Sequence, residues 1–235
     1  MTTVTAVNTV LDAFVAPSAL FERFEYNQRQ SSIVLVILFA LILASYYLFF
    51  GGMSDEWLLA QQLAQVGDLS IQEREIALEM MAKTLPYTWV FMGGVTIVGH
   101  LFTVIGLSLL FTLLGKISSI GMSRFTFRDW FYFISWCQLP WIVNYAGFSF
   151  LFLSSSASDL PLSLIHYASF EQLFSNQSVT DTAYGLYTSL NLFLVWSIVI
   201  SILGLRKCFN MKLAMATFIS IFPYVVFFGT WLLFI

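Results

Sequence analysis

The sequence predicts an all-α integral membrane protein with five transmembrane helices. Hydrophobic residues make up 59% of the 235-residue chain and charged residues 10%, against about 45–50% and about 25% in soluble domains. So few charges cannot cover the surface of a water-soluble globule, and so apolar a composition excludes intrinsic disorder. Five apolar runs are also close to the length of about 20 residues that crosses a bilayer. Because backbone polar groups in lipid must be satisfied within the segment, we expect these runs to be helices.

The predicted spans cover about 33–50, 87–114, 130–153, 183–205 and 213–235, and together they form one transmembrane domain, 33–235. The preceding tail, 1–32, is expected to be amphipathic. Pro17 ends a first helical pattern, and Ser18 caps a second helix whose apolar side carries Leu20, Phe21 and Phe24. Two interpretations are open. The tail lies in the membrane interface with its apolar side against lipid, or it covers the cytoplasmic end of the helix bundle.

The distribution of Lys and Arg predicts the orientation. Eight of these residues lie in the tail and in the two connections that follow the second and fourth spans, whereas only Arg74 and Lys83 lie on the opposite side. That opposite side carries nine acidic residues, Glu171 among them. Because cytoplasmic loops carry the excess of Lys and Arg, we expect the N-terminus in the cytoplasm and the C-terminus outside.

The first outer connection, 51–86, has the pattern of a helical hairpin. Ser54 is placed to cap a helix that ends at Gly67, and Ser70 with Glu73 forms a capping box that opens a second helix, to about Thr84. The acids of this hairpin are interpreted as a solvated face; an acidic docking surface for a partner is the alternative.

Four polar residues are predicted to lie deep in the membrane, where polar groups are costly and therefore informative. They form a candidate intramembrane cluster of His100, Gln138, Asn144 and Asn191. His100 is the one ionisable residue near a midplane, and Asn144 and Asn191 share a depth at which they are able to bond across helices. Hydrogen bonding that holds helices together is one interpretation, and a ligand-contacting or pH-sensitive group is the other.

Two prolines, Pro140 and Pro223, fall inside the third and fifth spans and are predicted to kink them. The sequence has none of the common nucleophile, phosphate-loop or metalloprotease motifs. We therefore expect no enzyme, and no catalytic, cofactor-binding or metal-binding residue. The two cysteines have no metal-ligand spacing, and no basic patch indicates a nucleic-acid partner.

Several stretches resemble the YIP domain family, the Ypt/Rab-interacting membrane proteins and their prokaryotic relatives. They are the Pro-Ser and Phe-Glu-Arg of 14–23, the pattern of 127–130 followed by 138–140, the run 191–196 with 204–207, and 212–214. The resemblance implies five helices and a cytosolic N-terminus. The short tail and the acidic first outer loop are similar to the bacterial branch, so binding of a small GTPase is not carried over.

The leading hypothesis is a non-catalytic protein that acts through partners, lipids or membrane organisation, in contact with the bilayer and with a membrane protein or a second copy of itself. The alternative is a small transporter whose pathway is lined by the polar cluster and gated at the prolines. The family branch implies a bacterial inner membrane, and a eukaryotic member would lie in the Golgi or endoplasmic-reticulum membrane.

Overall fold

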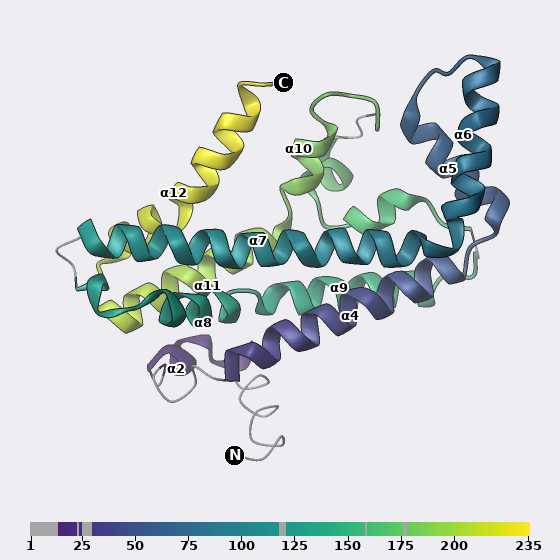
Figure 1. The fold of residues 1–235 in the computed structure, drawn as a ribbon. Coiled ribbons are helices and arrows are strands. Elements are labelled where there is room, and N and C mark those ends of the chain that lie inside the picture. Colours follow the sequence, from purple (N-terminus) through teal and green to yellow (C-terminus); the bar gives the residue numbers. More distant parts are fainter. Residues whose placement is uncertain (1–13, 23, 25–29, 118–120, 158, 176–177) are drawn as a thin grey trace. The chain divides into compact units, whose positions relative to one another are not determined.

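The computed structural model describes residues 14–22, 24, 30–117, 121–157, 159–175 and 178–235. The regular elements of these residues are helical, apart from one isolated bridge between Ser169 and Asn191. Within this part of the chain, four helical segments are long and apolar enough to cross a membrane (Figure 1). They are α4 (Ser31–Gly51), the stretch Ile71–Ile117 that contains α7 (Thr88–Ile117), α11 (Leu192–Phe209) and α12 (Leu213–Leu232). Residues 1–13 of the predicted amphipathic tail lie outside the described residues.

The predicted third span, 130–153, is not one helix. α8 (Phe127–Trp136) ends before α9 (Leu139–Leu153) begins. Pro140 is the second residue of α9, and because it has no N–H it leaves the carbonyl of Trp136 without its helical donor. Just before this break, the backbone N–H of Gln138 donates to the carbonyl of Ser135 at 3.1 Å. The kink predicted at Pro140 is therefore a helix break, whereas α12 continues through Pro223.

The predicted fourth span is also interrupted. The short helix α10 (Tyr184–Ser189) ends before Leu190 and Asn191, and α11 starts at Leu192. The amide of Phe170 donates to the carbonyl of Leu190 at 2.7 Å, and the amide of Leu192 donates to the carbonyl of Ala168 at 3.0 Å. Pairing with a distant loop thus satisfies backbone groups that a continuous helix would satisfy itself.

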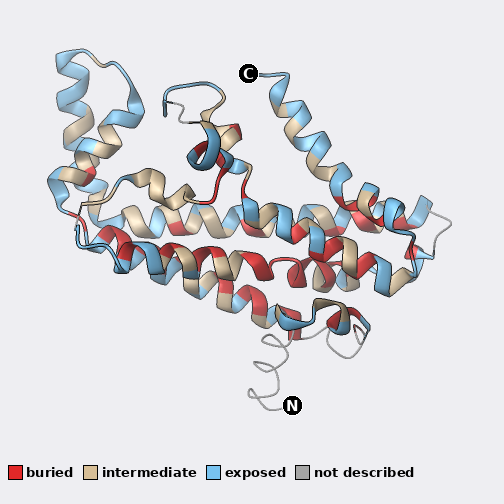
Figure 2. Cartoon of the chain, turned by 180° about the vertical axis from the view of Figure 1, so that it is seen from behind, coloured by how far each residue is buried: buried red, intermediate tan, exposed pale blue. Residues whose placement is uncertain are grey.

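The chain divides into two compact units. The first holds Met1–Phe39, Val98–Val143 and Phe193–Phe234, and the second holds Ala40–Ile97, Asn144–Leu192 and Ile235. Most of α12, which leads to the marked C-terminus, is exposed (Figure 2). The apolar composition of this helix makes lipid the natural solvent for that surface.

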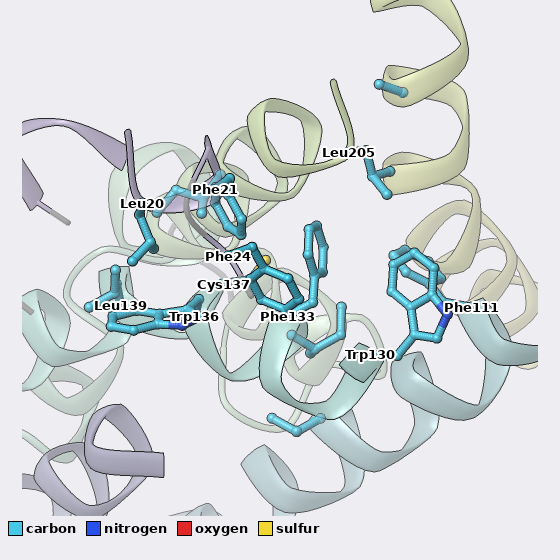
Figure 3. Packing of buried hydrophobic residues seen from close by; sticks show 14 of the residues in the cluster. Leu20, Phe21, Phe24, Phe111, Trp130, Phe133, Trp136, Cys137, Leu139 and Leu205 are labelled. Carbon is cyan, nitrogen blue, oxygen red and sulfur yellow. The ribbon is translucent and has the colours of Figure 1, made fainter. Parts of the chain in front are cut away.

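The core of the first unit is aromatic (Figure 3). Phe133, which is fully buried, packs at ring-centroid distances of 5.1 Å from Phe21 and 5.4 Å from Trp130. Gly204 makes this possible, because a Cβ there would lie 2.6 Å from the Phe133 ring and 2.9 Å from that of Phe21.

The end of the N-terminal tail belongs to this core. The short helix α2 (Pro17–Glu22) contributes Leu20 and Phe21, and Phe24 follows it; these side chains are only 5%, 2% and 3% exposed. Other residues of the chain therefore cover this apolar side.

The second unit contains the predicted hairpin (Figure 1). α5 (Asp55–Val66) is capped by Ser54 and stops at Gly67, and α6 (Ile71–Thr84) opens with the capping box of Ser70 and Glu73. These helices and their caps are confirmed as predicted. The 3₁₀ turn η2 (Leu85–Tyr87) leads from α6 into α7.

Long-range hydrogen bonds fix the hairpin to the rest of its unit. The backbone and side chain of Ser54 both donate to the carboxylate of Asp159, at 2.9 Å and 3.0 Å. The indole N–H of Trp57 donates to the carbonyl of Leu160 at 3.1 Å. The start of α5 therefore has a fixed position against the segment that follows α9.

Candidate functional site

The first unit brings together two of the four residues of the predicted polar cluster. His100 projects from α7, and its Nδ1 lies 3.1 Å from the side-chain oxygen of Gln138. Both residues are buried, with 9% and 2% of their surfaces exposed. Because an amide oxygen only accepts, this contact places a proton on Nδ1 of the imidazole.

The helix break positions this pair. Gln138 is in the short connection between α8 and α9, and its carbonyl accepts the amide N–H of Trp141 at 3.0 Å. The ring of Trp141 then meets that of His100 edge-on, with centroids 5.0 Å apart and an interplanar angle of 74°. Local chemistry at Pro140 thus sets both the amide partner and the aromatic neighbour of the histidine.

Asn144 lies in the second unit, on α9, and is 3% exposed. Its side-chain oxygen has no hydrogen-bond partner among the described residues, so the predicted bond to Asn191 is not made through this atom. The backbone carbonyl of Asn144 accepts from the hydroxyl of Tyr167 at 3.2 Å. Gly147 allows this approach, since a Cβ there would lie 2.5 Å from the same hydroxyl.

Asn191 lies in the interruption between α10 and α11, and it is 7% exposed. Its backbone forms the isolated bridge with Ser169, which is fully buried. The structure therefore gives Asn191 a place in a paired turn rather than inside a continuous helix. The sequence predicts it about two turns into the span 183–205, because that run is predominantly apolar.

Sequence reasoning missed Glu171, which it only counted among the nine acidic residues of the outer side. This residue is 3% exposed and begins a π-helical turn, Glu171–Ser175. The side-chain amide of Gln172 donates to its carboxylate at 2.7 Å. The sequence around Glu171 held one signal of its burial, because this residue is the only acid in a stretch rich in Phe and Leu.

His166 accompanies this carboxylate in the second unit. Burial lowers the pKa of His166 below its ordinary value, and the charge of Glu171 acts in the opposite direction. In the described part of the chain, no three His, Cys, Asp or Glu side chains gather in a way that could hold a metal ion. The polar groups present are suited to hydrogen bonding with a polar partner.

The described residues form an all-helical fold with four segments long and apolar enough to cross a membrane, as in an integral membrane protein. The particular family follows from comparison: a family model described as Yip1 domain matches residues 11–234. The chain belongs to the Yip1 domain family, as its sequence resemblance predicts. No curated protein and no solved structure matches it.

Proposed function

We propose that this chain acts without catalysis, by binding a partner protein or lipid and thereby organising the membrane around it. The observation that carries the proposal is the outer surface of the hairpin. α6 has no buried residue, and Ile76 and Met80 are 60% and 64% exposed. Four residues apart, they lie on the same face of the helix.

The hairpin has the properties of a fixed platform. Both of its helices are capped, and Ser54 and Trp57 attach the first helix to 159–160. A preorganised helical face loses little conformational entropy when it binds. Exposed apolar residues on such a face, with charged neighbours such as Glu79 and Lys83, are typical of interaction sites.

The topology that we propose has five crossings, with the N-terminus in the cytoplasm and the C-terminus outside. Four of them are the long apolar segments. The remaining one is the pair α8 and α9, which have 10 and 15 residues and a summed length of about 37 Å at 1.5 Å per residue. That length suffices for a hydrocarbon core of about 30 Å. We place the chain in a bacterial inner membrane; the Golgi or endoplasmic reticulum is the eukaryotic equivalent.

Site-specific photo-crosslinking in native membranes tests the hairpin proposal. A photoreactive residue at Ile76 or Met80 is expected to give a discrete crosslinked product, either protein or lipid. The matched control is Glu75, which is exposed on the same helix and faces a different direction. Equal crosslinking from all three positions, or none from any, would contradict a specific binding face.

A second candidate function, transport, is favoured by the break between α8 and α9. Discontinuous membrane helices form substrate sites in many transporters, and here the break carries the buried pair of His100 and Gln138. Solute flux into proteoliposomes, compared with empty liposomes and with a His100→Ala variant, tests this function. The absence of flux over a broad solute panel would remove it.

A further inference from the structure

The end of α7, the end of α11 and the start of α12 belong to the first unit. α7 ends at Ile117, α11 ends at Phe209 and α12 begins after Lys212. All three belong to segments long and apolar enough to cross a membrane. In the topology proposed above, these ends lie at the depth of the lipid headgroups.

Close packing brings the turn η3 (Met122–Arg124) against the end of α7. Gly115 has no side chain, and a Cβ there would lie 3.0 Å from the carbonyl oxygen of Met122. Gly121, with a φ of 78°, turns the chain in the left-handed region that glycine adopts without strain. The chain that leaves α7 thus folds back on the helix end that carries Lys116.

Arg124 then joins this turn to α11. Its guanidinium donates to the carbonyl of Cys208, and it lies 5.0 Å from the centroid of the Phe209 ring. The connection between α7 and α8 is therefore held against the C-terminal end of α11. Arg124 itself is committed to these contacts.

Four further cations surround this junction. Lys116, Arg128, Arg206 and Lys212 are exposed, and none lies within 4.0 Å of a carboxylate of the described residues. The nearby acids are already engaged. Glu22 pairs with Lys207 at 2.5 Å, and Asp129 accepts the backbone and hydroxyl protons of Thr126 at 2.8 Å and 2.7 Å.

We propose that these four cations, the basic end of the first unit, bind the phosphate groups of anionic phospholipids. Charge complementarity carries the assignment, because a cluster of unopposed cations at headgroup depth faces phosphate as its nearest abundant anion. Juxtamembrane Lys and Arg clusters are attracted to anionic lipid in this way. The inference rests on the crossings of α7, α11 and α12 proposed above, and it is independent of the hairpin and of its partner.

Lipid retention by the purified full-length chain tests the proposal. Native mass spectrometry after incubation with equal amounts of phosphatidylglycerol and phosphatidylcholine is expected to show a several-fold preference for phosphatidylglycerol. The variant K116Q/R128Q/R206Q/K212Q is expected to lose most of that preference. The matched control R74Q/K83Q, which removes two exposed cations from α6, is expected to retain it.

Several results would overturn the proposal. The first is an unchanged preference for phosphatidylglycerol in the quadruple variant, and the second is an equal loss of that preference in the R74Q/K83Q control. The third is thermal stabilisation by inorganic phosphate equal to that by phosphatidylglycerol, which would indicate a site for a free anion. If the quadruple variant lacks the native helical circular dichroism, the pairs K116Q/R128Q and R206Q/K212Q replace it, and each is expected to lose part of the preference. A K116R/K212R variant keeps the charge and is expected to behave as the wild type; a loss there would contradict a charge-based site.

Discussion

Each of the two units is stabilised internally by a different balance of aromatic packing and hydrogen bonding. In the first unit, large rings pack without exposed surface around Phe133 and Trp130, and Gly204 provides the space. In the second unit, side-chain hydrogen bonds join segments distant in sequence, as between Ser54 and Asp159 or between Tyr167 and Asn144. The aromatic rings of α4 and α9 also pack there, but serine, threonine and tyrosine hydroxyls accompany them.

This difference predicts different sensitivities. Close-packed interiors tolerate added volume poorly because neighbours cannot move. Removal of one neutral hydrogen bond lowers the free energy of unfolding by about 0.5–1.5 kcal/mol, and its effect is confined to the segments that the bond joins. Substitutions in the first unit should therefore lower the stability of the whole chain, whereas substitutions in the second should loosen particular segments.

The largest effect is expected for Gly204→Ala. The new Cβ would lie 2.6 Å from the buried ring of Phe133, and overpacking of this kind costs about 1–3 kcal/mol. Thermal unfolding in detergent, followed by tryptophan fluorescence, measures the change. Gly106→Ala on α7 is the matched control, because its Cβ would meet nothing within 4 Å. Equal effects of the two substitutions would contradict the packing argument.

A smaller and local effect is expected for Asp159→Ala. The substitution removes the acceptor of both Ser54 donors, and partial exposure limits the loss to about 1 kcal/mol. Amide hydrogen exchange should accelerate in the first turn of α5 and remain unchanged in α11. The control Asp68→Ala, in the exposed connection between α5 and α6, should leave hydrogen exchange in both helices unchanged. Faster exchange throughout the chain in Asp159→Ala would argue against a local connection.

The third prediction concerns His166 and pH. Because burial lowers its pKa in the folded state, the unfolded chain takes up the proton first once the pH falls below about 6.5. The free energy of unfolding is therefore unaffected by this group above that pH, and it decreases as the pH falls toward the folded pKa. Unfolding temperatures between about pH 7.5 and about pH 5.5 should show a decrease that is smaller in His166→Gln. Parallel profiles for the two proteins would contradict a lowered pKa of His166 in the folded chain.

The smallest effect concerns Glu73, which is fully exposed. Hydrogen bonds from the side chain and backbone of Ser70 lower the pKa of Glu73 below its ordinary value. The stabilisation is therefore complete above that ordinary value and is lost as the pH falls through the folded pKa. Hydrogen exchange in the first turn of α6 should rise on acidification in the wild type. Glu73→Gln, which keeps a capping-box side chain but does not titrate, should be less sensitive.

The parts of the fold that depend on local chemistry could be predicted from the sequence. Ser54, Gly67, Ser70 and Glu73 define α5 and α6 through contacts within three or four residues, and both helices begin and end as predicted. The apolar runs likewise predict α4, α7 and α12, because hydrophobic length alone determines a spanning helix.

The interruptions and the site could be predicted only in part. Pro140 indicates a disturbance of the third span, but the contact of Gln138 with His100 joins residues 38 positions apart. The turn at 190–191 depends on pairing with 168–170, and the same pairing accompanies the burial of Glu171. No local pattern encodes such contacts, since loop segments of similar composition are usually solvated.

The pair α8 and α9 decides the number of crossings, and labelling both chain ends tests it. Epitope tags at the N- and C-termini are exposed to a membrane-impermeant probe in intact cells and after permeabilisation. Five crossings predict a C-terminal tag that is labelled in intact cells and an N-terminal tag that is labelled only after permeabilisation. Both tags on the same side would mean that the broken pair does not cross the bilayer, and it would contradict the topology proposed for this family member.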